Sequence, residues 1–305
     1  EVDGQMALSI TIGMDPDLLT LGGFVLTWHG FFTFVGVAVV VWLAARWAQR
    51  AGVIPDVAYS VAVWAIIGGI VGARLVHVID RWDYYQHNLH QVLFIWEPGI
   101  AIWGAVLGAF AGAGIYCWVK RYPLGLFADI AAPATAIGMG IGRLGDIING
   151  EHIGDPTGMP WGFVYTHWKS PTNQFLGFTP THPAVLYEML YDFAIAWVVL
   201  RLQTRLRPHG MTFVAFLSLY ALGRFFISFF RLSGTPGGEV EWLPGLVQAQ
   251  VISIVVLAVC LPLLVFRAHW LRRPRPLQMP PAPQPMPSAQ PPPTVRGRAT
   301  ERRKG

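Results

Sequence analysis

Long hydrophobic stretches alternate with short polar connections along most of the 305-residue chain. Most stretches are close to 20 residues long, the length with which an α-helix crosses a hydrocarbon core about 30 Å thick. The pattern predicts seven membrane-spanning helices, at residues 21–45, 57–78, 99–119, 124–141, 183–200, 211–230 and 246–266. Pro133 and the glycines that follow it predict a kink or a break in the fourth helix. We therefore expect an all-α integral membrane protein with seven transmembrane helices.

The composition supports this class. Only 13% of the residues are charged and 53% are hydrophobic, with a mean hydropathy of +0.45. Soluble domains carry roughly 25% charged residues, so a soluble globular protein is excluded. The net charge of +5 comes largely from the C-terminal end and does not indicate binding to nucleic acid. Both cysteines, Cys117 and Cys260, lie in hydrophobic stretches, which disfavours a disulfide framework or a zinc site.

The distribution of lysine and arginine orients the predicted helices. The connections after the first, third, fifth and seventh helices, with the C-terminal tail, contain 16 of the 22 basic residues. Basic residues accumulate on the cytoplasmic side, so we expect the N-terminus outside and the C-terminus in the cytoplasm. Residues 1–20 then form an outer segment, and residues 21–269 form a membrane domain with an outer connection at 142–182. Residues 270–305, rich in proline and arginine, are predicted to be a disordered cytoplasmic tail on an anionic leaflet.

Small residues recur four apart on two predicted helices. Gly104, Gly108 and Gly112 form one such row on the third helix, and Gly68 and Gly72 form another on the second. Glycines at this spacing allow helix backbones to approach closely in a membrane. We interpret both rows as packing faces.

Four arginines lie at membrane depth near the outer side, where few basic residues are expected: Arg74, Arg143, Arg224 and Arg231. Ionisable groups at this depth are costly and usually face a cavity or a partner. Neutralisation by nearby carboxylates would account for one arginine. Four of them favour an anionic ligand, because the guanidinium fork suits phosphate. A phospholipid head group is the anion found at that depth.

The densest polar stretch, GRLGDIINGEHIGDPTGMPWGFVY, covers residues 142–165. It begins within a hydrophobic helix and continues into the outer connection. Arg143, Asp146, Asn149, Glu151 and His152 alternate with glycines, which let backbone approach a ligand. A simple turn would not require this combination of ionisable and amide groups.

This stretch resembles the GRxGNxxNGExxG…PxxxPWG signature of the prolipoprotein diacylglyceryl transferase family. Four further segments are similar to family motifs and follow the same order along the chain: GARL at 72–75, THPAVLYE at 181–188, YALGRFFISFFR at 220–231, and the pair Gln250 and Ser253. The resemblance extends from about residue 21 to residue 266 and implies the same seven-helix, N-terminus-out plan.

The resemblance implies an enzyme of the bacterial inner membrane. Such an enzyme moves a diacylglyceryl group from phosphatidylglycerol to the lipobox cysteine of a preprolipoprotein, the first step of lipoprotein maturation, and releases glycerol phosphate. It requires no metal and no cofactor. Arg143 and Arg224 would bind the phosphate and stabilise the leaving charge, with Glu151 as a further catalytic group. The residues implied to contact the lipid are Arg74, Arg143, Asp146, Asn149, Gly154, Tyr220, Arg224 and Arg231.

Five positions depart from the family pattern. Trp103 replaces a histidine that is a candidate base, and Asp146 replaces asparagine. Ser228 replaces glutamate, Val185 replaces glutamine, and His29 replaces tyrosine. Arg143 precedes Asp146 by three residues, which predicts an ion pair between them.

Two histidines are candidates for the base that takes the thiol proton. A neutral imidazole accepts such a proton near neutral pH. His29 lies near the outer end of the first helix, and His182 lies at the start of the fifth. Each is alternatively a packing or helix-capping residue.

Other functions remain as alternatives to the transferase. A paralogue with the same scaffold would bind phospholipid without the transfer, or with altered specificity. A retinal protein is excluded because the only lysines are Lys120, Lys169 and Lys304, none of them in the seventh helix. A transporter would show paired repeats with broken helices, and the sequence contains no convincing repeat.

Overall fold

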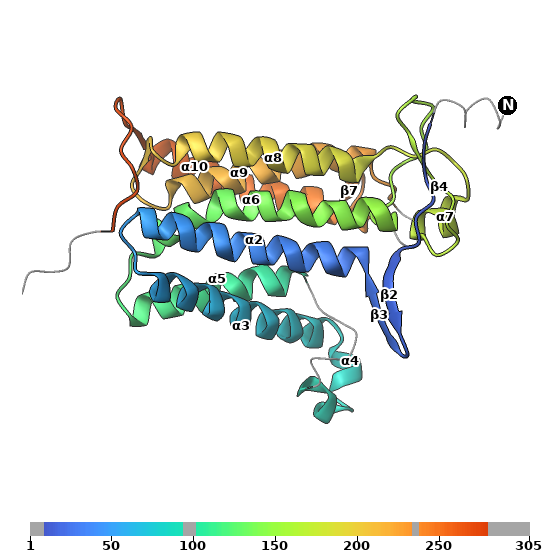
Figure 1. The fold of residues 1–305 in the computed structure, drawn as a ribbon, viewed down its shortest axis with the longest axis horizontal. Coiled ribbons are helices and arrows are strands. Elements are labelled where there is room, and N and C mark those ends of the chain that lie inside the picture. Colours follow the sequence, from blue (N-terminus) through green and yellow to red (C-terminus); the bar gives the residue numbers. More distant parts are fainter. Residues whose placement is uncertain (1–8, 94–101, 234–237, 280–305) are drawn as a thin grey trace, which may run out of the picture.

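The computed structural model describes residues 9–93, 102–233 and 238–279 and consists mainly of long helices that lie side by side (Figure 1). The long helices are α2 (Trp28–Arg50), α3 (Pro55–Asp80), α5 (Ile102–Val119), α6 (Leu124–Asn149), α8 (Ala184–Leu202), α9 (Met211–Ile227) and α10 (Gln248–Arg267). Within the described residues, five helices are long and apolar enough to cross a membrane; they correspond to α2, α3, α6, α9 (extended to Phe230) and α10. The chain is therefore a mostly helical integral membrane protein.

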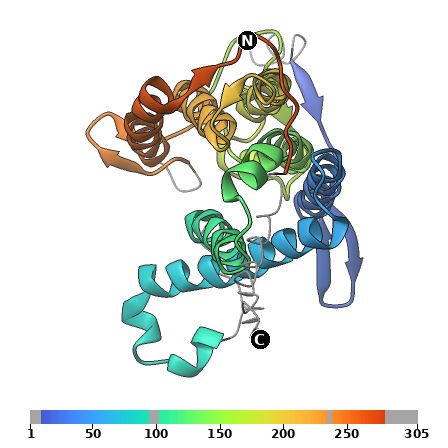
Figure 2. The same ribbon diagram turned by 90° about the vertical axis from the view of Figure 1, so that its left-hand side faces the viewer.

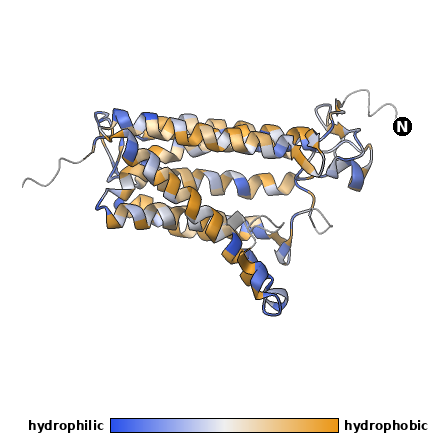
Figure 3. Ribbon diagram, turned by 60° about the horizontal axis from the view of Figure 1, so that its bottom comes forward, coloured by the Kyte–Doolittle hydropathy of each residue, from blue (hydrophilic) through white to orange (hydrophobic). Residues whose placement is uncertain are grey.

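Helix α6 forms the centre of the bundle. Of its most hydrophobic 18-residue window, 56% is buried, against 17% for α10. Helices α2, α8 and α9 pack against α6, and α10 packs against α9. Figure 2 shows α3 and α5 as a pair set apart from the other helices. Hydrophobic residues dominate the helices in Figure 3, and the side chains of Trp118 and Phe266 are about 80% exposed, as expected for lipid-facing positions.

The predicted glycine packing faces are confirmed. A Cβ atom on Gly68 would overlap the carbonyl oxygen of Gly108, and one on Gly72 would overlap that of Gly104. The backbones of α3 and α5 are therefore in direct contact, as small residues permit. Gly36 and Gly138 bring α2 and α6 together in the same way.

The first predicted helix begins too early in the sequence-based assignment. Residues 17–27 form a hairpin of β2 (Asp17–Leu21) and β3 (Phe24–Thr27), and α2 begins only at Trp28. Gly22, with φ +59°, makes the turn, and the Thr27 hydroxyl accepts a hydrogen bond from the amide of Gly30 (3.1 Å) as the helix N-cap. Hydrophobicity alone does not distinguish a strand from a helix in an uncharged run.

Of the kink or break predicted at Pro133, the break is wrong, because α6 runs without interruption to Asn149. Proline has no amide hydrogen for the carbonyl four residues earlier, which belongs to Asp129. The Gln203 side-chain amide, just after α8, donates to that carbonyl at 3.0 Å. The helix continues because a neighbouring segment satisfies the released carbonyl.

Short elements gather at the end of the bundle where the chain begins (right in Figure 1). Strand β1 (Ile10–Ile12) pairs in parallel with β4 (Phe163–Tyr165). Lys169 forms ion pairs with Asp15 and Asp17 at 3.1 and 2.6 Å. These contacts attach the N-terminal segment to the connection between α6 and α8. The other elements there are α4 (Trp82–Tyr85), the 3₁₀ segments η1 (Leu89–Leu93) and η2 (Ser228–Phe230), α7 (Pro171–Leu176), β6 (Glu241–Leu243) and β7 (Leu246–Val247).

At the opposite end, the segment after α10 lies against the bundle. Strand β8 (His269–Trp270) pairs with β5 (Leu206–Arg207), and the amide of Met279 donates to the Ala51 carbonyl at 2.7 Å. Leu277 is buried among residues of α2, α3 and α6. Residues 270–279, predicted as the start of a disordered tail, thus pack against the helix bundle in the structure. Residues 280–305 lie outside the described residues.

Candidate functional site

A cluster of charged side chains lies where α6, α8 and α9 meet, at the N-terminal end of the bundle. Arg143 and Asp146 occupy the last two turns of α6, and Glu188 lies in the second turn of α8. Arg224 lies near the end of α9, and Arg231 follows η2. Three of the four arginines singled out in the sequence therefore come together, from segments far apart in the chain.

Glu188 is the centre of this cluster. Its carboxylate accepts a hydrogen bond from Arg231 at 2.8 Å and forms ion pairs with Arg143 at 2.7 Å and Arg224 at 3.3 Å. Glu188 and Arg231 are buried, and the side chains of Arg143 and Arg224 are 16% and 17% exposed. A buried carboxylate with three guanidinium partners fixes their relative positions.

Glu239 is a site residue that the sequence reasoning missed. Its carboxylate forms an ion pair with Arg224 and lies 3.4 Å from Arg231. The Ser228 hydroxyl, where the family pattern has a glutamate, accepts from Arg224 at 3.1 Å. The Glu239 carboxylate thus contacts Arg224 and Arg231, the two arginines that flank the family's glutamate position, from a segment later in the chain. Nothing in the sequence around Glu239 marks it, because the contact depends on how the segment after η2 folds back.

Asp146 joins this cluster to a histidine. One oxygen of its carboxylate lies 2.5 Å from Nδ1 of His29, and the other accepts from Arg143 at 2.9 Å. The predicted Arg143–Asp146 ion pair is confirmed. Gly145 allows this approach of α2 and α6, because a Cβ there would lie 2.6 Å from the Cα of His29.

The end of α6 positions Asn149 and Glu151. Gly150, with φ +73°, ends the helix in the left-handed conformation, and a Cβ there would overlap the Ser170 hydroxyl. The Asn149 side chain is buried and donates to Glu151 at 2.9 Å. Glu151 also lies 3.5 Å from His29. Both predicted residues are thus brought to the site.

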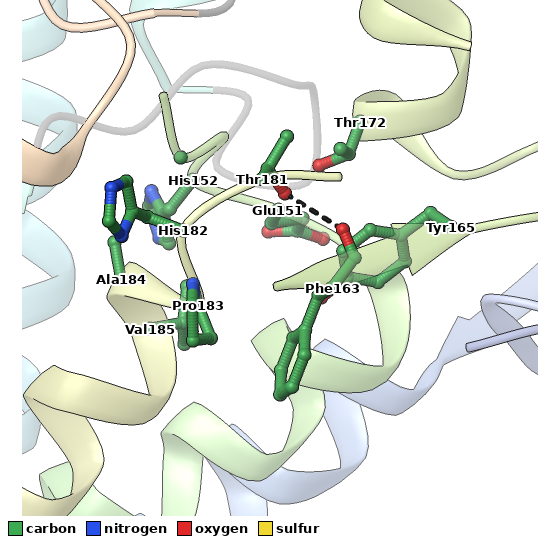
Figure 4. Close-up of a pocket in the computed structure, with 11 residues that line it drawn as sticks. Glu151, His152, Phe163, Tyr165, Thr172, Thr181, His182, Pro183, Ala184 and Val185 are labelled. Atoms are coloured by element: carbon green, nitrogen blue, oxygen red, sulfur yellow. Dashed lines mark hydrogen bonds between the residues drawn. The ribbon is translucent and has the colours of Figure 1, made fainter. Parts of the chain in front are cut away.

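Gly154 and His182 line one pocket. Figure 4 shows His182 among the labelled residues of this pocket. A Cβ on Gly154 would overlap the His182 carbonyl oxygen, and the His182 amide donates to the Asp155 carbonyl at 2.8 Å. Glu151 and His152 line the same pocket. The His182 imidazole lies 3.5 Å from the Tyr187 hydroxyl and packs against Phe230. Glycine is thus required at position 154 for close backbone approach.

His152 is held neutral in this surrounding. Partial burial, together with the positive charges of Arg231 and Arg143, lowers the pKa of His152 to about 4. Its Nε2 lies 3.7 Å from the Asp146 carboxylate. His152 is therefore uncharged at neutral pH and a weak base.

Two predicted lipid contacts have different surroundings. Tyr220 lies on α9, one turn before Arg224. Its ring stacks on that of Phe216, with ring centroids 6.4 Å apart. Arg74, in contrast, donates to the carbonyls of Gln91 and Val92 at 2.6 and 3.1 Å. Its guanidinium is held by the α4–η1 side of the molecule rather than by the carboxylates that hold the other three arginines. The side chain of Trp103 lies outside the described residues.

Among the described residues, one group has the spacing of metal ligands. Ligand atoms of His29, Asp146 and Glu151 lie within 4.8 Å of one another. The Arg143 guanidinium, 2.9 Å from the same Asp146 carboxylate, already supplies a positive charge there. The Asp146 carboxylate thus has both oxygens in contact with side chains of this chain, one with His29 and one with Arg143.

The fold and this site define a polytopic membrane protein with arginines clustered around buried carboxylates at one end of its helices. The sequence profile of the prolipoprotein diacylglyceryl transferase family matches residues 16–266, and the chain belongs to that family. The resemblance seen in the motifs is thereby confirmed.

Relatives extend over most of the chain. A phosphatidylglycerol–prolipoprotein diacylglyceryl transferase of Thermosynechococcus vestitus is 33% identical over 79% of this chain and 88% of its own length. A protein of the same name from Dehalococcoides mccartyi is 34% identical over 84% of this chain and 95% of its own length. A Streptomyces coelicolor protein named phosphatidylglycerol–prolipoprotein diacylglyceryl transferase 2 is 34% identical over 83% of this chain and 79% of its own length.

Proposed function

We propose that this protein transfers the diacylglyceryl group of phosphatidylglycerol to the lipobox cysteine thiol of a preprolipoprotein. The observation that carries the proposal is the set of three arginines arranged around Glu188. Family membership supplies the reaction class, and the relatives' names supply the two substrates.

The three arginines form the phosphate site in this proposal. Each guanidinium has five N–H donors in a rigid fork, and its carboxylate contacts use only some of them. Arg143 and Arg224 retain partly exposed donors that bind the lipid phosphate. Their charge then stabilises the glycerol phosphate as it leaves. Arg231, which is buried, binds the same phosphate from the interior of the bundle.

The remaining site residues surround the head group and the thiol. Asn149 and Glu151 orient the head group, Gly154 admits it beside the His182 backbone, and Tyr220 extends the Arg224 side of the site. His29 and His182 are the two candidates for the base that takes the thiol proton. No step in this scheme requires a metal or a cofactor.

The membrane arrangement is part of the proposal. All seven long helices cross the bacterial inner membrane, with the N-terminus outside and residues 268–279 on the cytoplasmic face. The distribution of basic residues supports this orientation. The site then lies at the level of the outer leaflet, where phosphatidylglycerol enters from the surrounding lipid.

Arginine variants test the proposal. Purified protein in phosphatidylglycerol vesicles receives a lipobox peptide, and mass spectrometry follows the diacylglyceryl adduct. We expect an adduct that is absent with a Cys→Ser peptide. Arg143→Ala and Arg224→Ala should each lower the rate by about 100- to 1,000-fold.

The matched control is Arg201→Ala, an exposed arginine on α8 that packs on Trp197. It should keep the wild-type rate. Full activity of either site variant contradicts the phosphate assignment. Lipid binding by the wild-type protein without any adduct indicates a paralogue that binds phospholipid only.

A further inference from the structure

His29 is held in one place by the first turn of α2 and the end of α6. The Thr27 cap fixes the start of α2, and His29 is the second residue of this helix. Its Nδ1 is 2.5 Å from one Asp146 oxygen. The side chain is nevertheless 43% exposed, so the ring is accessible from outside.

The partner of Nδ1 defines which ring nitrogen is basic. The Asp146 carboxylate, whose second oxygen accepts from Arg143 at 2.9 Å, is an acceptor only. Nδ1 must therefore carry the hydrogen of this contact, and in the neutral ring Nε2 carries the lone pair. Glu151, 3.5 Å from Nδ1, favours the same tautomer.

We infer that His29 Nε2 takes the proton of the acceptor thiol and that Asp146 is the positioning residue that holds the imidazole in this tautomer. The inference rests on the proposed transferase function. The S–H proton passes to Nε2, and the sulfur forms a bond to the glyceryl carbon of the lipid. The bond between that carbon and the phosphate oxygen breaks, and its electron pair leaves with glycerol phosphate. His29 then releases the proton to water.

The other histidines of the site have weaker arrangements for this role. The His182 Nδ1 lies 3.5 Å from the Tyr187 hydroxyl, a neutral partner that fixes neither tautomer. His152 lies 3.7 Å from Asp146, and its partial burial together with the neighbouring arginines disfavours its protonation. Asp146 as a direct phosphate ligand would repel the anion. The Asp146 carboxylate instead lies between His29 and Arg143, so it contacts both the proposed base and the proposed phosphate site.

Steady-state kinetics with both substrates test the inference on the purified full chain. His29→Gln retains a donor for Asp146 but has no basic nitrogen, so it should lower kcat by about 100- to 10,000-fold and leave the KM for phosphatidylglycerol unchanged. Asp146→Asn should also lower kcat. Because the two act through one another, the double variant should be no slower than His29→Gln alone. His87→Gln, an exposed histidine that contacts the Asp83 backbone, is the control and should keep the wild-type rate.

Two readouts distinguish a base from a structural residue. Added imidazole should restore part of the activity of His29→Ala, since the free base replaces the missing ring. The ¹⁵N spectrum of histidine-labelled wild-type protein should show His29 protonated at Nδ1 and unprotonated at Nε2.

Several results would overturn the inference. A fully active His29→Gln, a double variant that loses the product of the two single effects, or the opposite tautomer would each do so. A His182→Gln variant that is inactive while His29→Gln is active moves the base to His182. An inactive wild-type protein overturns the proposed function itself, and the inference with it.

Discussion

Two buried aspartates on α6 have different kinds of partner. Asp129, near the start of the helix, is fully buried and accepts from the backbone amides of Gly210 and Phe213 at 2.8 and 3.0 Å. Asp146, five turns later, contacts the side chains of His29 and Arg143. Asp129 therefore caps the N-terminus of α9 and stabilises the fold, whereas Asp146 lies between the proposed base and an arginine of the proposed phosphate site.

The difference shows that burial does not separate structural from functional carboxylates. Backbone amides cannot move without unfolding the helix that carries them, so a carboxylate bound to them is a fixed part of the scaffold. Side-chain partners can rearrange when a ligand arrives. The partners of each carboxylate, rather than its depth, therefore distinguish the structural aspartate from the one in the proposed site.

Glu188→Gln sharpens this comparison with the largest expected effect. The substitution leaves three guanidiniums without their common partner, and breaking such a buried pair costs about 3–5 kcal/mol. We expect a much lower apparent Tm in detergent and no transfer activity. Asp192→Asn, one turn later on α8 and also buried, is the matched variant, since no arginine of the described residues forms an ion pair with Asp192, whereas three do so with Glu188. Equal effects of both substitutions would contradict the central position of Glu188.

Asp129→Asn should separate stability from activity. Asparagine has one acceptor oxygen where the carboxylate has two, so one backbone amide of α9 loses its partner, at a cost of about 1–3 kcal/mol. Thermal unfolding in detergent should show the loss, and the rate per folded molecule should stay at the wild-type level. If instead the rate falls and the Tm does not, Asp129 is not a structural cap.

Gly154→Ala tests how closely the site depends on backbone approach. The added methyl group would overlap the His182 carbonyl, so the two segments must separate. We expect a weaker lipid interaction, seen as a raised KM for phosphatidylglycerol, with a small change in Tm. Gly158→Ala, in the same connection and with open space around it, is the control. An unchanged KM in Gly154→Ala would show that this approach does not shape the lipid site.

His152→Gln should have the smallest effect, seen only in acid. The pKa of His152 falls from 6.5 to about 4 on folding. Between pH 6.5 and pH 4 the unfolded chain therefore binds a proton at His152 that the folded chain does not bind. Wild-type stability should therefore decline as the pH drops from 6.5 towards 4. The apparent Tm of wild type should fall more between pH 7 and pH 5 than that of His152→Gln. Parallel declines would show that His152 titrates normally.

The sequence predicted those features that depend on hydrophobicity and local spacing. The helical membrane class, the α3–α5 glycine contact and the Arg143–Asp146 ion pair all follow from such patterns. The strand at 24–27 was not separated from the first helix, because residues 21–45 carry no charge and form one hydrophobic run. The uninterrupted α6 depends on Gln203, 70 residues after Pro133, and Glu239 reaches the arginines only through the fold of a connection. Such long-range contacts leave no local signal.

Simultaneous measurement of both reaction products tests the central claim most directly. Purified protein in phosphatidylglycerol vesicles receives a lipobox peptide, and glycerol phosphate and peptide thioether are quantified over time. We predict one molecule of glycerol phosphate for each thioether formed, and neither product with a Cys→Ser peptide. Glycerol phosphate without thioether, or no product from protein that binds the lipid, would contradict the account.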